Sequence, residues 1–487
     1  MKPNWLACCA ALGAVAIPAA VTTAASTALA APAPRISAPA AGPAAPGPST
    51  VRPGGNTAGG AELWRARYGK SPNGRGYPGS AVVSPDGSQV YIAGTMAVGY
   101  DAATGAQRWA APTRLSRGGF LGVSPDGSRV FVTGSSANGN GTLRYTTRAF
   151  NAATGAVLWT ASDHGPGTGD DQAQALAVSP DGSRVFVTGS SSDPQGTLRY
   201  ATIAYDAATG ARRWVARYSY QHLRAEAASV AVSPGGTQVF VTGGSAGPTG
   251  PGSAATVSYD AATGALQWVA RYRPPDGRGA TAASVAVSPD GATVYIAGTA
   301  QVRRGRAFPQ NIAVVAYTAA AGAQRWAALY PGAASPPPVY GSNAVAMALS
   351  PDGSAVFVAG QASTQGKALD NTVAVDAATG APRWARQAPL NGFGLPAGIA
   401  ASNTGVFITG RTTVSPGNGP TAYATVAYDA ATGAEHWTRL YTGSVPGFTQ
   451  ATSVAVSPDF SRVFVTGGTT GPNQQSEISY TTLAYSP

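Results

Sequence analysis

Two short turn sequences alternate along most of the chain after residue 60, and this repetition restricts the fold more than any other feature. Copies of Ser-Pro-Asp-Gly begin at Ser84, Ser124, Ser179, Ser288 and Ser350, with degraded copies at Ser233, Ser402 and Ser457. Copies of Asp-Ala-Ala-Thr-Gly begin at Asp101, Asp206, Asp260, Asp376 and Asp429, with variants at Asn151 and Thr318. Repeats longer than about 20 residues indicate solenoids, propellers or arrays.

The segments between these turns have the pattern of β-strands. Residues 183–189 (SRVFVTG) alternate polar and apolar side chains and are rich in β-branched residues, which is typical of strands. In Ser-Pro-Asp-Gly, Pro presets φ for a tight turn, Asp bonds its own backbone and Gly accepts positive φ. Each repeat therefore predicts four antiparallel strands, and such sheets bury both faces by stacking around a ring, as in β-propellers of four to eight blades.

Two independent counts give eight blades. The chain has eight Ser-Pro-Asp-Gly-like turns and eight tryptophans in expected fourth strands: Trp64, Trp109, Trp159, Trp214, Trp268, Trp326, Trp384 and Trp437. Trp64 precedes the first such turn, whereas the last repeat ends in its third strand. We therefore predict an all-β, eight-bladed propeller over residues 61–487, closed by residues 61–68 as the outer strand of the last blade.

The first 60 residues predict an export signal and a linker. Lys2 is followed by an apolar stretch and by Ala28-Leu29-Ala30, the pattern of a signal peptide with its cleavage site over residues 1–30. Residues 31–60 are mostly Ala, Pro, Gly and Ser, which predicts a disordered linker. We expect a secreted or extracellular bacterial protein, with attachment of the linker to the cell wall left open, and no membrane span.

Cysteine content and charge exclude several classes of site. The only cysteines, Cys8 and Cys9, lie in the expected signal, so the exported chain would have neither disulfides nor cysteine metal ligands. Removing Lys2 lowers the formal charge from +11 to +10, a mild excess that favours anionic polymers. Basic clusters with interleaved aromatic residues are missing from the sequence, and we predict no nucleic-acid binding. We expect a monomer.

The segment Tyr205–Trp214 (YDAATGARRW) resembles the repeat of the quinoprotein (PQQ-like) propeller superfamily, in which a fourth-strand Trp docks on the next blade. VSPDGSRVFVTG is similar to the YVTN and TolB-type repeats. Together these resemblances span nearly all of residues 61–487. They imply either a dehydrogenase that uses pyrroloquinoline quinone or a non-catalytic scaffold protein of the cell envelope, because one fold hosts several functions.

The dehydrogenases of this superfamily imply a chemistry that can be compared with the sequence. They place a disulfide of adjacent cysteines against the quinone, hold Ca²⁺ with Glu, Asn and Asp, and use an Asp base. Here the adjacent cysteines fall in the expected signal, and the chain shows no obvious set of six to eight oxygen ligands for Ca²⁺. The aspartates of the Ser-Pro-Asp-Gly turns are interpreted as structural.

Candidate binding residues occupy one repeated position. The short turns fall on one face of the predicted ring, whereas the variable loops between second and third strands and between blades fall on the other, where function concentrates. Seven residues before each Ser-Pro-Asp-Gly serine, at the expected mouth of the central channel, stand Tyr77, Arg117, Gln172, Glu226, Thr281, Asn343, Leu395 and Gln450. The ligand-binding candidates are Arg117, Gln172, Glu226, Asn343 and Gln450; alternatively, such residues merely solvate the channel.

Two further groups carry titratable side chains. Asp170 and Asp171 form the only acidic pair before an inner strand and are the weak candidates for a Ca²⁺ site. His222, Arg224 and Glu226 make the best acid–base grouping, with a solvated loop as the alternative. The sequence contains no nucleophile elbow, phosphate-binding loop or dinucleotide fingerprint.

These observations predict a secreted, non-enzymatic binding or scaffold propeller whose variable face binds a protein, a peptide or a cell-wall polysaccharide. The alternative is an oxidoreductase or hydrolase with its site at the channel mouth, with Ca²⁺ or pyrroloquinoline quinone as cofactor. A structural surface protein without a specific ligand is a third reading.

Overall fold

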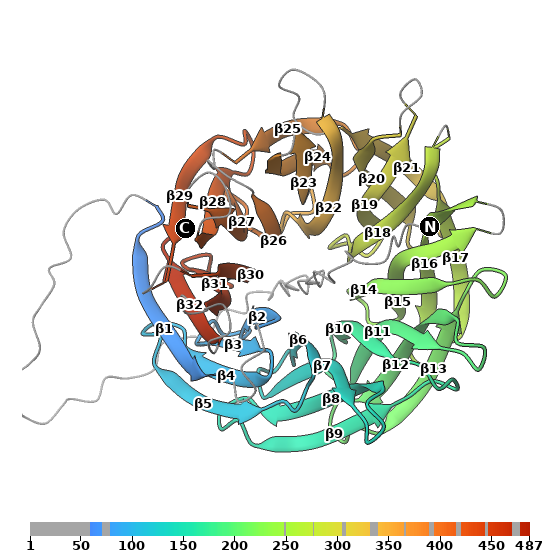
Figure 1. The fold of residues 1–487 in the computed structure, drawn as a ribbon, viewed down its shortest axis with the longest axis horizontal. Coiled ribbons are helices and arrows are strands. Elements are labelled where there is room, and N and C mark those ends of the chain that lie inside the picture. The colour runs from blue at the N-terminus through green and yellow to red at the C-terminus, as the bar shows by residue number, and fades with distance from the viewer. Residues whose placement is uncertain are drawn as a thin grey trace, which may run out of the picture.

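The computed structural model describes residues 59–70, 78–247, 250–275, 277–303, 308–331, 339–364, 367–388, 394–414, 420–443, 447–469 and 478–487. The expected signal peptide, most of the linker and Tyr77 lie outside these residues. The described residues form 32 strands in eight four-stranded antiparallel blades around a central axis (Figure 1). The predicted eight-bladed propeller is confirmed.

Strands are numbered along the chain, and the first strand of each blade is innermost. Blade 1 contains β2 (Ser80–Val83), β3 (Gln89–Ala93), β4 (Met96–Asp101) and β5 (Gln107–Pro112), and blade 2 contains β6 (Arg117–Val123), β7 (Arg129–Ala137), β8 (Leu143–Asn151) and β9 (Val157–Asp163). Blade 3 contains β10 (Gln172–Val178), β11 (Arg184–Ser192), β12 (Leu198–Asp206) and β13 (Arg212–Tyr218), and blade 4 contains β14 (Ala225–Val232), β15 (Gln238–Gly247), β16 (Gly250–Asp260) and β17 (Leu266–Tyr272).

Blades 5 to 8 continue the same order. Blade 5 contains β18 (Gly277–Val287), β19 (Thr293–Val302), β20 (Gln310–Thr318) and β21 (Gln324–Tyr330), and blade 6 contains β22 (Val339–Leu349), β23 (Ala355–Thr364), β24 (Lys367–Asp376) and β25 (Pro382–Gln387). Blade 7 contains β26 (Leu395–Ala401), β27 (Gly405–Thr413), β28 (Thr421–Asp429) and β29 (Glu435–Tyr441), and blade 8 contains β30 (Thr449–Val456), β31 (Val463–Thr469), β32 (Ser479–Tyr485) and β1 (Glu62–Lys70).

The ring closes through β1, as predicted. β1 pairs antiparallel with β32, with Trp64 opposite Ala484 and Arg67 opposite Thr481. Gly60 N–H donates to the Ser486 carbonyl (2.9 Å), and Ser486 N–H donates to the Ala61 carbonyl (2.9 Å). The same two bonds close the Asp-Ala-Ala-Thr-Gly turn of blade 3, so residues from the two ends of the ring together build an equivalent turn in blade 8.

The tryptophans explain why the second turn sequence recurs. In blade 3, Gly210 has φ 73° and an added Cβ would lie 2.6 Å from the ring of Trp159 in blade 2, so only glycine lets that ring pack flat on the turn. The equivalent glycine receives a tryptophan at every blade junction. At seven junctions the indole N–H also donates to the carbonyl of the first turn alanine, over 2.7–3.2 Å.

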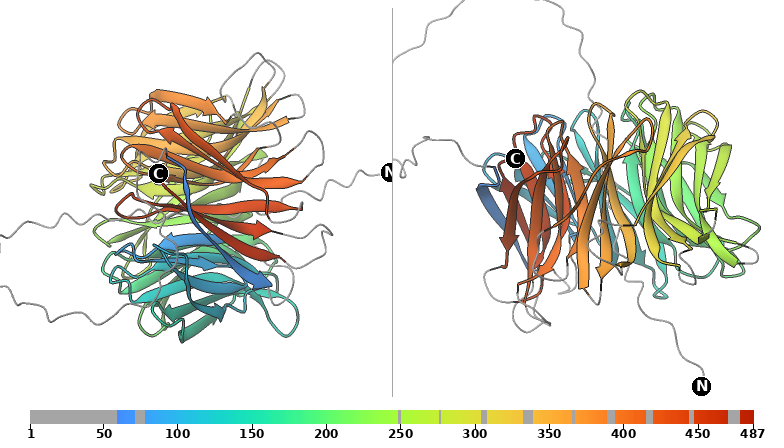
Figure 2. Two further views of the ribbon diagram at one scale, coloured as in Figure 1. Left: turned by 90° about the vertical axis from the view of Figure 1, so that its left-hand side faces the viewer. Right: turned by 90° about the horizontal axis from the view of Figure 1, so that it is seen from above.

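The core lies between the blades rather than inside any one of them. Each cluster of buried side chains joins strands from two neighbouring blades; one contains Phe131 and Trp159 of blade 2 with Val185 and Ile203 of blade 3. Consequently no blade buries its apolar surface alone, and the ring positions every loop. Seen edge-on, the strands end on two opposite faces (Figure 2). The short turns form one face, called here the turn face, and the variable loops and blade-to-blade connections form the other, the loop face.

Candidate functional site

The predicted mouth residues occupy equivalent positions on seven inner strands. In each described case the mouth residue stands opposite the residue directly after the glycine that ends the apolar part of the neighbouring strand. The pairs are Arg117–Ser135, Gln172–Ser190, Glu226–Gly244, Thr281–Thr299, Asn343–Gln361, Leu395–Arg411 and Gln450–Gly468. They therefore form one level around the axis on the loop face, and they do not gather in a single pocket.

A groove on the loop face contains two of these positions. It lies over blades 4 and 5, has a volume of about 450 Å³, and is lined by Glu226 and Thr281 together with Arg224, Gln174 and Ser245. The remaining wall is made of alanine and glycine. An added Cβ on Gly244 would lie 3.3 Å from Thr281 Cγ2, so the small residues keep the groove open.

An ion pair marks one side of this groove. Arg224 Nη2 donates to Glu226 Oε1. The two side chains are 67% and 45% exposed, so solvent screens their attraction and the pair contributes little to stability. Both charged groups are consequently available to a ligand, and the groove offers one cation, one carboxylate, two hydroxyls and an amide beside an apolar wall.

His222 does not join this group. Its Nδ1 lies 3.3 Å from Arg199 Nη1, a cation that also donates to Ser219 Oγ (2.7 Å) and pairs with Asp193. Because Arg199 has no acceptor atom, His222 Nδ1 accepts this bond with its lone pair. The acid–base grouping expected from the sequence is therefore split, with His222 in the connection between blades 3 and 4, against Arg199 of β12, and Arg224 with Glu226 in the groove.

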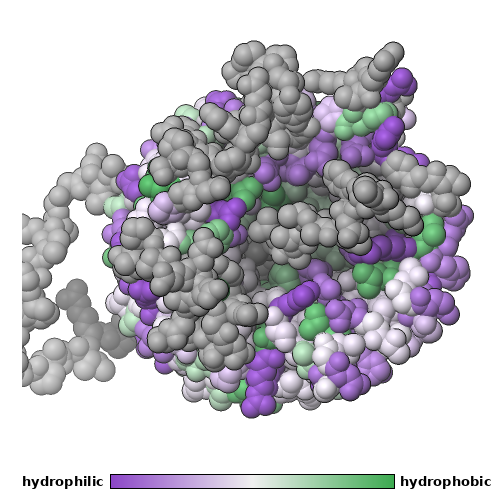
Figure 3. Space-filling model, viewed as in Figure 1, coloured by the Kyte–Doolittle hydropathy of each residue, from purple (hydrophilic) through white to green (hydrophobic). Residues whose placement is uncertain are grey.

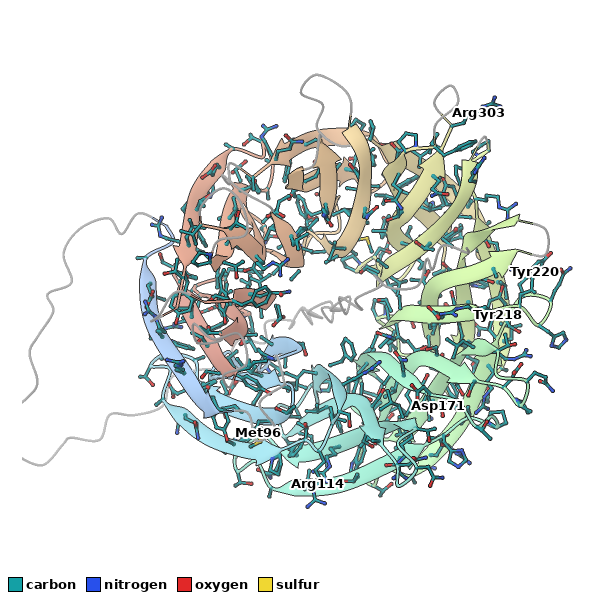
Figure 4. All side chains as sticks on the ribbon, viewed as in Figure 1. Met96, Arg114, Asp171, Tyr218, Tyr220 and Arg303 are labelled. Atoms are coloured by element: carbon teal, nitrogen blue, oxygen red, sulfur yellow. The ribbon has the colours of Figure 1, made fainter. Side chains whose placement is uncertain are left out.

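The connection from blade 3 to blade 4 holds this side of the groove in place. Gln221 and His222 have φ 47° and 60°, which is uncommon for residues other than glycine. The Arg271 guanidinium stacks over the Tyr220 ring, 3.6 Å from its centroid, and donates to the Ser245 hydroxyl (3.4 Å). Figure 4 shows Tyr218 and Tyr220 on this side of the ring. The groove thus lies beside a braced loop.

The weak metal candidates each bind backbone amides. Asp170 Oδ1 accepts from Leu143 N–H (2.8 Å), and the buried Asp171 carboxylate accepts from Gly165 N–H (2.7 Å) and Ser192 N–H (3.1 Å). Both carboxylates therefore fasten the loop between blades 2 and 3. Within the described parts of the chain, no group of three or more His, Cys, Asp or Glu side chains is arranged to hold a metal ion.

The aspartates of the Ser-Pro-Asp-Gly turns stabilise their own turns. In blade 2, Asp126 accepts from the Ser124 hydroxyl, from Ser128 N–H (3.0 Å) and from the Ser128 hydroxyl. Hydrogen bonds from Ser124 first, and then from Ser128, lower the pKa of Asp126 to about 2. A carboxylate so fully satisfied by its own turn has little capacity for chemistry.

Sequence reasoning missed Gln174 and Ser245 as groove residues. Gln174 lies at a β-bulge between Ala173 and Ala175, where regular pairing with β11 is interrupted. The bulge changes which side chains reach the groove, and it could not be predicted from the sequence pattern. Ser245 needed the register between β14 and β15, because the serine lies opposite Ala225.

Comparison with known proteins agrees with the fold. A family model described as "Outer membrane protein assembly factor BamB" matches residues 54–247 and 148–471. No curated protein matches the chain. Among solved structures, quinohemoprotein alcohol dehydrogenase from Comamonas testosteroni is 15% identical with a TM-score of 0.52, covering 88% of this chain and 76% of that one. BamB from Moraxella catarrhalis is 14% identical with a TM-score of 0.50, covering 88% of this chain and 99% of that one. At such identities the likeness shows the fold alone.

The described residues do not fit the quinone that the name of the quinohemoprotein alcohol dehydrogenase implies. A planar aromatic cofactor needs flat apolar surfaces and a few convergent polar groups. All eight described tryptophans lie on fourth strands, and seven of their indole N–H groups bond the next blade. The described chain contains no cysteine and no metal-ligand cluster.

Proposed function

The chain belongs to the family of the outer membrane protein assembly factor BamB, and from this premise we propose that it is a non-enzymatic binding or scaffold propeller acting outside the cytoplasm. The observation that carries the proposal is the open groove of Arg224, Glu226 and Thr281 on the loop face. It offers exposed, mutually paired charges at the start of β14, which suits recognition of a polar ligand.

The occupant proposed for this groove is an extended segment of a partner protein. A peptide carries backbone donors and acceptors for Gln174 and Ser245, and charged side chains of either sign for Arg224 and Glu226. The alanine and glycine wall would take small apolar side chains. A cell-wall polysaccharide is the alternative occupant, since the hydroxyl and amide groups also suit sugars. Export through residues 1–30 is part of the proposal and rests on the sequence pattern. We propose a monomeric protein.

Crosslinking from the groove tests this proposal. A photoactivatable amino acid at Thr281, in the full chain secreted by its producing cells, is expected to give one or two discrete protein adducts. The same amino acid at Gln89, which is next to the Ser84 turn on the turn face, is the control and should give none. Adducts of equal yield from both positions, or adducts from neither, would contradict the proposal, whereas an adduct that a polysaccharide hydrolase removes identifies the alternative occupant.

An oxidoreductase or hydrolase at the channel mouth is the second candidate, and no observation on the described residues favours it. Its remaining support is the fold that the chain shares with the dehydrogenase from Comamonas testosteroni. Proteins of one fold carry different activities, so this likeness alone assigns no reaction.

A further inference from the structure

One arginine departs from the pattern of its seven counterparts. In each blade, the residue directly after the fourth-strand tryptophan pairs with one residue of the third strand. In seven blades this third-strand residue is a buried aliphatic side chain: Val98, Ile203, Val257, Val315, Val373, Val426 and Leu483. In blade 2 the same position, opposite Thr160, holds Arg148. Placing a guanidinium where the fold otherwise buries a methyl-bearing side chain costs stability unless something compensates its charge.

The neighbouring blade explains how an arginine fits there. The strands of blade 1 are only four to six residues long, and its second and third strands are joined by residues 94–95 alone. Blade 2 has strands of seven to nine residues. The end of blade 2 nearest the loop face therefore extends beyond the shorter strands of blade 1. Blade 1 does not cover this end of blade 2, whereas longer neighbours cover the other blades.

The uncovered part is polar on the face directed at blade 1. Phe150, two residues from Arg148, stacks with Trp109 of blade 1, and Arg148 Nη1 donates to the Pro112 carbonyl (2.8 Å). Beside Arg148 on this face stand Arg144 and Thr160, whereas Thr146 is buried and its hydroxyl is bonded to Ser136 and Ser162. The matching face of blade 3 is apolar, with Ala201, Ile203 and Val215 packed against blade 2. We call the uncovered region, defined by Arg114, Arg144, Arg148 and Thr160, the blade 1–2 notch.

The notch holds positive charge without a matching negative charge. Burial first, and then the charge of nearby Arg114, lower the pKa of Arg148. The Nε atoms of Arg144 and Arg148 are buried and have no acceptor. None of the ion pairs between described residues includes Arg114, Arg144 or Arg148. Arg114 is exposed, and Figure 4 shows it at the rim of the ring beside blade 2.

We propose that the blade 1–2 notch is a phosphate-binding site, in which Arg148 and Arg114 hold the anion and the exposed Thr160 adds a hydroxyl donor. Several guanidinium and hydroxyl donors that approach from different elements suit a tetrahedral oxyanion, which accepts hydrogen bonds on every side. The ligand is free phosphate or a phosphate ester of a larger molecule, since both present the same group. This site is separate from the groove of the proposed function and does not depend on it.

Phosphate binding is tested on the full chain by calorimetric titration and by thermal unfolding in phosphate and in chloride at equal ionic strength. A ligand that binds only the folded state raises the unfolding midpoint. We expect inorganic phosphate to raise the midpoint of the natural protein. Arg148→Ile should bind at least about tenfold more weakly, the loss expected for one charge-assisted hydrogen bond.

The isoleucine is the residue that blade 3 carries at this position, so Arg148→Ile should fold and, without phosphate, should unfold at a higher midpoint than the natural protein. Arg129→Gln removes one charge at the turn of the same blade and should keep the full phosphate response. Arg114→Gln should weaken the response and replaces the isoleucine variant if that one does not fold. Equal phosphate responses in all four proteins would overturn the proposal. Binding of glycerol phosphate as tightly as inorganic phosphate assigns the site to an ester, and weaker binding assigns it to the free anion.

Discussion

At the scale of single residues, each blade junction depends on a glycine that a larger residue cannot replace. Gly210 has φ 73°, and an added Cβ would lie 2.6 Å from Cδ2 of Trp159. Gly210→Ala should lower the free energy of unfolding by at least about 2 kcal/mol, because the left-handed backbone is strained and the indole must move. Urea unfolding measures this. Gly139→Ala is the control, since nothing lies within 4 Å of its added Cβ, and an equal loss in both variants would refute this explanation.

The turn carboxylates give the protein a predictable response to acid. Hydrogen bonds from Arg213 first, and then from Thr209, lower the pKa of Asp206 to about 2 from its ordinary value of 3.8. A carboxylate whose pKa is lower in the folded state stabilises the fold above its unfolded pKa and loses that contribution as pH falls through the folded pKa. Asp101, Asp376 and Asp459 have similarly lowered values. The contribution of these turn carboxylates to the free energy of unfolding should therefore be constant from pH 7 to about 5 and fall between about pH 4 and 2.

Asp206→Asn isolates one such group. The natural Asn151 of blade 2 accepts the same backbone amides, from Ala153 (3.1 Å) and Thr154 (3.0 Å), so the variant should fold. Its unfolding free energy should fall less steeply between about pH 4 and 2, as urea titrations at each pH would show. An unchanged slope would mean that Asp206 contributes nothing to the acid response.

At the scale of elements, β1 closes the ring and its tryptophan carries much of that contact. The Trp64 ring packs on Gly105 of blade 1, and its Nε1–H donates to Ala102 O (3.0 Å). Trp64→Ala should cost about 3–5 kcal/mol. Leu63→Ala, at a side chain that is 47% exposed, should change stability by less than about 0.5 kcal/mol. Equilibrium unfolding measures both changes. Deleting residues 61–68 should lower the free energy of unfolding further than Trp64→Ala does. A mild effect of that deletion would contradict closure by β1.

The strands were predictable because the same turn and strand patterns recur in every repeat. The turn sequences, the alternation in SRVFVTG and the phase shift between turns and tryptophans together predicted 32 strands and the closing strand. The site was less predictable. The mouth position was correctly aligned across the blades, but the sequence did not show that Glu226 and Thr281 share a groove, because that depends on the contact between β14 and β18. Arg148 was visible as a break in the aligned third strands, yet its meaning required the shortness of blade 1.

At the scale of the whole molecule, the turn face and the loop face carry different kinds of residue. The turn face holds six aspartates in Ser-Pro-Asp-Gly-type turns and five in Asp-Ala-Ala-Thr-Gly turns, which cap their own backbone. The loop face carries the groove and the blade 1–2 notch. On the face in view in Figure 3, hydrophobic patches are small and separated by hydrophilic residues, which suits ligands held by charge and hydrogen bonds. The described chain contains no helix with the length and hydropathy that crossing a membrane requires.

The proposed function requires that this propeller binds a partner and performs no quinone-dependent oxidation. The most direct measurement is thermal unfolding of residues 31–487 with and without Ca²⁺ and pyrroloquinoline quinone, followed by dye reduction with alcohols and sugars as substrates. The account predicts an unchanged midpoint with the quinone and no dye reduction, because the described tryptophans are committed to blade contacts. A midpoint raised by the quinone, together with turnover of the dye, would contradict it and identify the protein as a dehydrogenase.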